Sequence, residues 1–298
     1  MTGPSNTMAI ERHAVSRGAR CARALRWLRR FRGWERVASI MSPPGEAGDF
    51  VVRNATGVFA GDMTSFIERQ LYLFGGYEDE MLDLFRSFMA TTERRTILDV
   101  GANIGTHAIA FARDFNLVHA FEPNPSMWPR FQRNVALNGL ANARLHQTGL
   151  GDERADLPFY LTANANLGLG TVCAIEQYDT PLAPAGVAHI EKGDEFVASH
   201  GLSSIDAIKI DVQGFEPEVL AGLRETLRQH RPVVWMELGA ATANKLASVE
   251  ALRASFPLPV EIFRFVRAKR FPRVRFRLER VDEGALPQGD YLTRPVPR

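Results

Sequence analysis

The stretch Thr96-Ile-Leu-Asp-Val-Gly-Ala-Asn-Ile-Gly-Thr106 decides the fold. Its first five residues form a short apolar run bounded by glycine, which is typical of a buried strand, and residues 106–113 repeat with helical spacing. Between them, Gly101 and Gly105 allow a sharp turn in which the backbone comes close to a ligand. The order strand, glycine turn and helix predicts a ligand-binding turn at the carboxyl edge of a parallel sheet.

Strands and helices alternate along the chain after this turn. This alternation indicates an α/β fold with a doubly wound parallel sheet, which means that helices cover both of its faces. The expected strands are 117–121, 143–150, 205–210, 232–238, 260–266, 273–280 and 291–293, and the expected helices are 126–138, 216–229 and 242–254.

The N-terminal part of the chain differs in charge. The whole chain has a formal net charge of +2, but residues 1–36 contain nine arginines and two glutamates, about +7. Apolar residues such as Leu25, Leu28 and Trp34 recur between the arginines at helical spacing, which predicts one or two basic amphipathic helices. Residues 10–41 then form either a peripheral contact with an anionic membrane or an acidic partner, or helices packed on the main domain with solvated arginines.

Proline and glycine mark the boundary of this arm. Residues 42–48 contain two prolines and two glycines, which end any helix. Residues 50–59 then predict a hairpin, because apolar strand formers flank a turn that contains glycine. We therefore divide the chain into a basic helical arm (1–45), a cover segment (46–95) and a ligand-binding domain (96–298).

The glycine turn and two acids indicate the kind of ligand. Asn103 stands where dinucleotide sites have their second glycine, which disfavours pyrophosphate and suits a ligand with a carboxylate and a sulfonium. Backbone amides at the start of the helix would receive the carboxylate. Glu122 ends the next strand, where a carboxylate accepts hydrogen bonds from a ribose diol. Asp152 follows the third strand, where a carboxylate can accept a hydrogen bond from an adenine amino group.

A second group of acids ends the later strands. Asp211 follows the strand 205–210, Glu216 begins the next helix and Glu237 ends the strand after it, so that three carboxylates converge on one edge of the sheet. Glu216 has a second interpretation, because an acid at a helix N-terminus is often only a cap. An acid at the end of a central strand has no such simple structural role.

These motifs resemble the FkbM family of S-adenosylmethionine-dependent methyltransferases, a branch of the class I methyltransferase superfamily. The resemblance covers residues 49–298, and residues 1–45 lie outside it. Gln213 and Phe215 depart from the usual Asp-Val-Glu-Gly-Ala-Glu pattern of the family, whereas Asp211 and Glu216 match it. The matching stretches are 67–69, 76–78, Asp99-Val-Gly-Ala-Asn-Ile-Gly105, Ala120-Phe-Glu-Pro-Asn-Pro125, 134–138, Ile208-Lys-Ile-Asp-Val-Gln-Gly214, Arg231-Pro232 and Glu237.

The resemblance implies a fold, a cofactor and residue roles. The implied fold is a mostly parallel, seven-stranded Rossmann-like sheet with an N-terminal helical and hairpin extension, and the implied cofactor is S-adenosylmethionine. In this interpretation the methionine part is surrounded by the turn after the first strand, the ribose is held at the second strand, the adenine lies near the third, and a residue of the cover segment closes over the site. The residues in these roles are Asp99, Gly101, Asn103 and Gly105, then Glu122, Asp152 and Glu78.

The implied reaction is methylation of a hydroxyl on a sugar, glycan or other secondary metabolite. Methyl transfer from an activated donor is an in-line displacement, so the protein mainly positions the acceptor and removes its proton. We expect Asp211 or Glu216 to be the base and Glu237 to orient the acceptor. Alternatively, the three carboxylates bind a divalent cation such as Mg²⁺ that acidifies the hydroxyl.

Other features weigh against other classes of protein. With Cys21 and Cys173 as its two cysteines, and with no apolar run long enough for a membrane span or a signal peptide, the chain is expected to be cytoplasmic. Methylation of nucleic-acid bases is disfavoured, because residues 211–214 lack the prolines and the aromatic residue of that motif. Two alternatives stay open: a membrane- or nucleic-acid-tethered interaction protein with a vestigial adenosine pocket, and a nicotinamide-dependent oxidoreductase.

Overall fold

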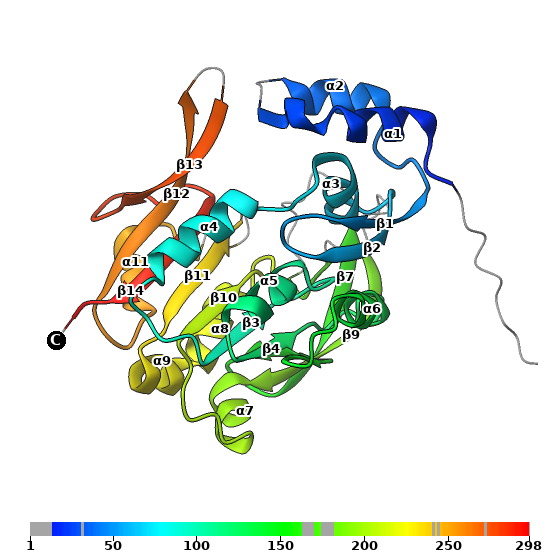
Figure 1. Ribbon diagram of the computed structural model, residues 1–298. Helices are drawn as coiled ribbons and strands as arrows, with labels where there is room; N and C mark the ends of the chain where they lie inside the picture. The colour runs from blue at the N-terminus through cyan, green and yellow to red at the C-terminus, as the bar shows by residue number, and fades with distance from the viewer. Residues whose placement is uncertain are drawn as a thin grey trace, which may run out of the picture.

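The computed structural model describes residues 14–30, 33–162, 170–173, 182–239, 242, 245–270 and 273–297. The central element formed by these residues is an eight-stranded sheet (Figure 1). From one edge to the other its strands are β13 (Arg273–Arg280), β12 (Val260–Arg270), β14 (Gly289–Pro295), β11 (Val233–Leu238), β10 (Ala207–Ile210), β3 (Thr96–Val100), β4 (Leu117–Phe121) and β5 (Ala143–His146).

The sheet confirms the α/β fold and corrects its details. β5, β4, β3, β10 and β11 are parallel neighbours, and this doubly wound order places the topological switch point between β3 and β10. Among the described residues the central sheet has eight strands, one more than the seven expected. The additional strand is β13, which forms a long antiparallel pair with β12 at the edge of the sheet. β14 is antiparallel to both β11 and β12, so the parallel part of the sheet ends at β11.

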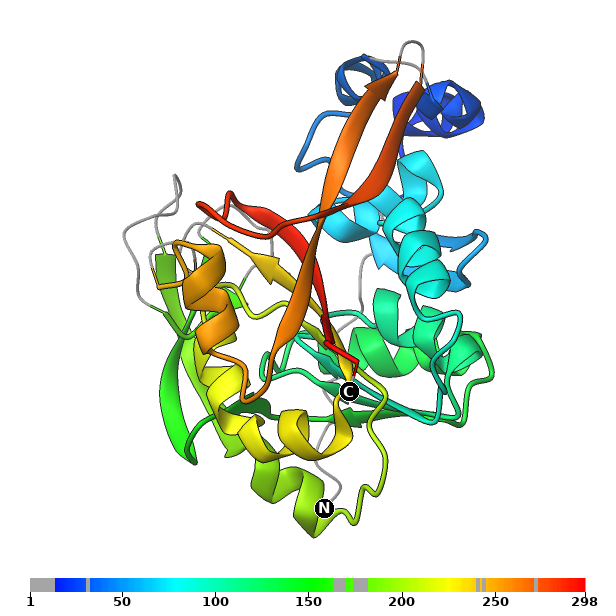
Figure 2. The same ribbon diagram turned by 90° about the vertical axis from the view of Figure 1, so that its left-hand side faces the viewer.

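Helices cover both faces of this sheet (Figures 1 and 2). Side chains of β3 alternate between two apolar cores: Ile97 belongs to one and Leu98 to the other. This double burial explains why Ile97, Leu98 and Val100 are apolar although they point to opposite faces of the sheet. The first core includes α4 (Asp79–Phe88), α5 (Thr106–Asp114) and α6 (Trp128–Leu137), and the second includes α7 (Gly193–Ser199), α8 (Glu216–Gly222), α9 (Arg224–His230) and α11 (Val249–Ala254).

A second, four-stranded sheet accounts for much of the region between β5 and α7. Its strands, in order, are β6 (Gly149–Gly151), β9 (Leu182–Lys192), β7 (Ala155–Thr162) and β8 (Gly170–Thr171). The single strand expected at 143–150 is therefore two strands, because the chain leaves the central sheet after β5 and joins the second sheet at β6. Residues 161–196 have no periodic sequence pattern, but β8, β9 and the start of α7 fall within them, whereas residues 163–169 and 174–181 lie outside the described residues.

The N-terminal arm is packed on the rest of the molecule. α1 (Arg17–Ala24), the 3₁₀ helix η1 (Arg26–Arg30) and α2 (Trp34–Met41) lie against one another and next to α3 (Phe66–Phe74), which in turn contacts the predicted hairpin of β1 (Asp49–Arg53) and β2 (Val58–Asp62). Small buried residues allow this contact: a Cβ on Gly18 would lie 1.9 Å from the carbonyl oxygen of Met41. The fully buried alanines of this layer are Ala19, Ala22 and Ala38.

No helix in the described part of the chain is long and apolar enough to cross a bilayer.

Candidate active site

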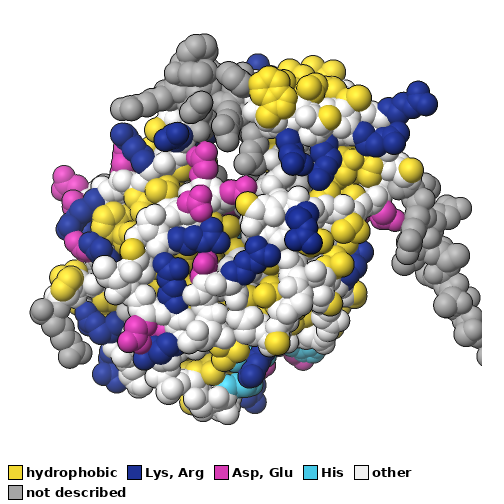
Figure 3. Space-filling view, in the orientation of Figure 1, with side chains coloured by type: hydrophobic (Ala, Val, Ile, Leu, Met, Phe, Trp, Pro, Cys, Tyr) yellow, Lys and Arg dark blue, Asp and Glu magenta, His cyan; other side chains and the backbone are white. Residues whose placement is uncertain are grey.

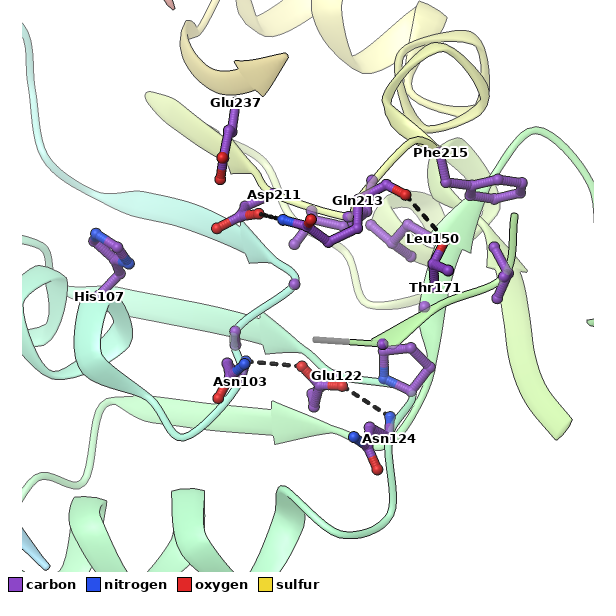
Figure 4. A pocket seen from close by; sticks show the side chains of 18 of the residues that line it. Asn103, His107, Glu122, Asn124, Leu150, Thr171, Asp211, Gln213, Phe215 and Glu237 are labelled. Carbon is purple, nitrogen blue, oxygen red and sulfur yellow. Dashed lines mark hydrogen bonds between the residues drawn. The ribbon is translucent and has the colours of Figure 1, made fainter. Parts of the chain in front are cut away.

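A cavity of about 360 Å³ lies where β3, β4 and β10 end (Figure 4). This is the switch point of the sheet, where open α/β folds bind ligands, and the volume falls within the range of roughly 300–1,000 Å³ of small-molecule sites. The carboxyl groups of Glu122, Asp211 and Glu237 line it, and no lysine or arginine among the described residues does. The cavity therefore has an acidic character.

The turn after β3 is held together by its own backbone. Gly101 has a φ of +89°, and a Cβ there would lie 1.9 Å from the carbonyl oxygen of Asp211, so glycine is needed where the β3 and β10 loops meet. The amides of residues 101–105 all donate hydrogen bonds to acceptors within the protein. These five amides are therefore paired within the protein, and the contact between a ligand carboxylate and backbone amides stays a prediction for the start of the helix. The next amides along the chain belong to the first turn of α5, where Thr106 and His107 line the cavity.

Glu122 is held at the end of β4 by two backbone amides. The amide of Asn103 donates to its Oε2 at 2.8 Å, and the amide of Asn124 donates to its Oε1 at 2.8 Å. Burial raises the pKa of Glu122 to about 7, although both hydrogen bonds oppose this shift. The structure thus brings a buried carboxyl to the cavity wall at the position where the ribose interaction is predicted.

Asp211 is held at the end of β10 by side chains instead. Lys209 Nζ lies 3.1 Å from its Oδ2, and Gln213 Nε2 donates to its Oδ1 at 2.9 Å. Burial disfavours the charge of Asp211, but the Lys209 ammonium and these hydrogen bonds lower its pKa below the usual value. The Asp211 carboxylate is therefore ionised at neutral pH.

Glu237 forms a pair with Asp211 at the end of β11, and Figure 4 shows the two carboxyl groups facing each other. The negative charge of Asp211, together with burial, raises the pKa of Glu237 to about 10. Glu237 is therefore protonated at neutral pH and can donate a hydrogen bond to Asp211. The pair carries one negative charge and one transferable proton.

Glu216, by contrast, does not line the cavity. Its carboxylate is buried and accepts hydrogen bonds from the amides of Val212 and Gly214, at 3.3 and 3.1 Å, and from the hydroxyl of Thr242. These contacts hold the turn between Asp211 and α8. The geometry indicates a structural role for Glu216, although the bonded amides precede α8 and are not those of the helix itself.

Glu78 reaches the site through another residue. It does not line the cavity, but its Oε2 lies 3.0 Å from Nε2 of His107, which does. Tyr77, a lining residue that the sequence analysis missed, lies edge-on to the His107 ring. Three of the four described non-glycine residues with positive φ flank this cavity, which is typical of functional sites. They are Glu78, Asn103 and Gln213.

The remaining predicted residues lie around the cavity without lining it. Asp99 is fully buried next to Lys209 on the neighbouring strand, and burial raises its pKa. Gly105 forms the N-cap of α5, and Asp152 is exposed. The wall near Asp152 is apolar and comes from Leu150 of β6, from Phe159 of β7 and from Ile190 of β9. No local sequence pattern predicted this wall.

Lys209 is a second omission, although the sequence contains a signal for it. It stands between two isoleucines in a strand that is buried on both faces, and its side chain is 4% exposed. A lysine in such a place requires an acidic partner. Among the described residues no group of three or more His, Cys, Asp or Glu side chains is arranged to hold a metal ion.

Comparison with known proteins identifies the family. A family model described as the methyltransferase FkbM domain matches residues 99–272, which is more than half of the chain. The chain belongs to the FkbM methyltransferase family. The match begins at Asp99 and includes Glu122, Asp211 and Glu237, so all three acidic residues of the cavity wall lie within the FkbM domain.

Three curated proteins resemble this FkbM chain. The hexuronic acid methyltransferase AglP of Haloferax volcanii is 31% identical over 192 residues, which cover 63% of this chain and 74% of AglP. Methyltransferase 1 of Beauveria bassiana is 29% identical, over 43% of this chain and 57% of that protein. The 2-O-methyltransferase NoeI of Sinorhizobium fredii is 28% identical, over 45% of this chain and 60% of NoeI. The matches thus span less than two thirds of two of these relatives, and none of the three is described as a nicotinamide enzyme or an interaction protein.

Proposed function

We propose that this FkbM protein transfers a methyl group from S-adenosylmethionine to a hydroxyl group of a sugar, glycan or other secondary metabolite. The charge of the cavity carries the proposal, because three carboxyl groups line it and no lysine or arginine among the described residues does. Such a wall, with Asp211 ionised, favours a cationic sulfonium, whereas it offers no lysine or arginine side chain to a dinucleotide pyrophosphate. The names of AglP and NoeI, a hexuronic acid methyltransferase and a 2-O-methyltransferase, support the class of acceptor.

The residues present fit the donor. Each oxygen of Glu122 receives one backbone hydrogen bond and keeps a lone pair for a ribose hydroxyl. Leu150 and Phe215 offer apolar surface for a flat base. The amino-acid end then lies toward the first turn of α5, where the helix dipole favours a carboxylate. When bound, the donor supplies a methyl group that its sulfonium has already activated.

Asp211 is the base in this proposal, and Glu237 orients the acceptor. As the acceptor oxygen forms its bond to the methyl carbon and the bond from that carbon to sulfur breaks, the hydroxyl proton passes to Asp211. Lys209 and Gln213 keep Asp211 ionised and hold its carboxylate in place. Glu237 remains protonated and orients the acceptor by donating a hydrogen bond to its reacting oxygen. Glu216 acts indirectly, because it holds the turn that carries Asp211.

Two measurements test this function. Calorimetric titration of the full chain with S-adenosylhomocysteine should show binding, and titration with NAD should show none. Incubation with labelled donor and candidate glycans, followed by mass spectrometry, should show acceptors that have gained one methyl group. Binding of NAD without binding of S-adenosylhomocysteine would overturn the proposal.

A further inference from the structure

The outward face of the N-terminal helices exposes large apolar side chains. Trp27 is 62% exposed, Val37 45% and Ile40 81%. Of the nine large hydrophobic residues exposed in the described part of the chain, four lie between residues 25 and 40. Exposed apolar groups gathered in this way mark an interaction site, whereas scattered ones do not. Figure 3 shows hydrophobic side chains at the end of the molecule where α1 and α2 lie, with lysine or arginine side chains beside them.

Arginines surround these apolar groups. Residues 14–45 contain eight arginines and one acidic residue, Glu35. The next acidic residue along the chain is Glu46. We call the exposed side chains of this face the N-terminal platform. Its residues are Arg17, Arg20, Leu25, Arg26, Trp27, Arg36, Val37 and Ile40.

A second basic element lies next to the platform. Figures 1 and 2 both show the far end of the β12–β13 pair beside α2. The exposed Arg275 and Arg277 belong to β13, and residues 264–280 contain eight lysines and arginines. Elements that are more than 200 residues apart in the chain thus bring positive charge to one end of the molecule.

We propose that the N-terminal platform docks the protein on a bilayer surface that contains anionic lipids. Arginines at such a surface interact with lipid phosphates, each strengthening binding by about fivefold. Trp27 and Ile40 enter the boundary between headgroups and acyl chains, where a tryptophan side chain is favoured. The interior side of the same helices is already covered by protein, since Trp34 and Ala38 are buried in the core.

The composition of the platform distinguishes a bilayer from other anionic or apolar partners. Exposed aliphatic groups such as Ile40 gain nothing from the phosphates of a nucleic acid, whereas lipid offers them an apolar phase. A second copy of this chain would bring arginines against arginines, which repel one another. The platform lies on α3, whose Phe66 and Ile67 line the cavity, so docking places that wall toward the lipid. This proposal does not depend on the identity of the methyl acceptor.

Vesicle sedimentation of the full chain tests the proposal. Binding to vesicles of phosphatidylcholine with about one third phosphatidylserine should be at least tenfold tighter than binding to phosphatidylcholine alone. It should weaken when the salt concentration rises from about 0.1 to about 0.5 M, because salt screens the arginines. Tryptophan fluorescence should shift to shorter wavelength on binding, and Trp27→Ser should remove that shift. Equal binding to both kinds of vesicle, or no binding to the anionic ones, would overturn the proposal.

Paired substitutions separate the two components of the surface. Trp27→Ser with Ile40→Ser should weaken binding to anionic vesicles by about tenfold, and Arg20→Glu with Arg36→Glu by at least that much. The matched control is Val187→Ser with Val296→Ser, since these side chains are 51% and 41% exposed elsewhere in the molecule, and it should leave binding unchanged. All six positions are exposed, so thermal unfolding should not change. Full binding by the Trp27→Ser, Ile40→Ser variant would mean that charge alone acts, and would overturn the proposed docking through apolar side chains that enter the bilayer.

Discussion

The two ends of the cavity hold their carboxyl groups by different means. Glu122 receives two backbone amides and no buried cation, so burial dominates and raises its pKa to about 7. Asp211 lies against the buried ammonium of Lys209, which lowers its pKa. Neutral amides therefore position a carboxyl group without keeping it ionised, whereas a buried lysine keeps it ionised. The first arrangement suits binding, and the second suits a base that must be ionised in every catalytic cycle.

Asp211→Asn should produce the largest effect on activity. The amide keeps the shape of the side chain but cannot accept the hydroxyl proton, so we expect kcat to fall by roughly 10²–10⁴-fold. The affinity for S-adenosylhomocysteine should stay within about threefold, because Glu122 lies at the other end of the cavity. Steady-state kinetics and calorimetry measure the two quantities. Unchanged kcat would show that Asp211 is not the base.

Lys209→Met tests whether the buried lysine keeps Asp211 ionised. Asp99 and Asp211 would then lack their buried cation, so we expect a loss of about 3–5 kcal/mol in the free energy of unfolding at neutral pH. Lys245→Met is the matched control, because Lys245 is 40% exposed and pairs with Glu218 near the surface. That variant should lose at most about 1 kcal/mol. Chemical denaturation measures both, and equal losses would show that burial of the Lys209 pair has no special role.

Local sequence patterns predicted the parts of the site that depend on neighbouring residues. The strand and glycine turn at 96–106, and the acids at the ends of β4, β10 and β11, follow from apolar runs and from the rule that parallel strands end at one edge. For Glu216 the sequence allowed two interpretations. The structure favours the structural one, because Glu216 lies outside the cavity lining and its partners include Thr242, which lies 26 residues further along the chain.

Contacts between distant segments could not be predicted in this way. The apolar wall depends on the pairing of β7 with β9, which are separated by an insertion without a periodic pattern. Strand pairs of this kind are determined by tertiary packing and not by local propensity. The turn amides are a similar case: their positions were expected, but their partners include Phe121 and Glu122 from the next strand.

Glu122→Gln tests the donor end. The amide lacks the charge, and its NH₂ group faces a backbone donor, so we expect the affinity for S-adenosylhomocysteine to fall by roughly 10–100-fold. Asp152→Asn is the control, because this acid is exposed and does not line the cavity. It should change the affinity by less than about twofold. A larger effect of Asp152→Asn would support the predicted contact with adenine.

The raised pKa of Glu122 should also make donor binding depend on pH. Ribose hydroxyls need the ionised carboxylate, which forms as pH rises through about 7. The affinity for S-adenosylhomocysteine should therefore be constant above that pH and fall toward tenfold per unit below it. Calorimetry between pH 5.5 and 8.5, at intervals of roughly half a unit, measures this profile. Glu122→Gln should remove the slope; a slope that persists in this variant would assign it to another group.

Glu237→Gln should have the smallest effect and gives the sharpest test of the comparison. Because Asp211 and burial raise the pKa of Glu237 to about 10, Glu237 is protonated at pH 7, and glutamine replaces one neutral hydrogen-bond donor by another. We expect kcat at pH 7 to change by less than about threefold, against the loss of at least about a hundredfold for Asp211→Asn. The reverse order would assign the base to Glu237 and the shared proton to Asp211. The two variants together therefore determine which member of the pair carries the charge, since removing a charge and replacing a neutral group have different costs in a buried site.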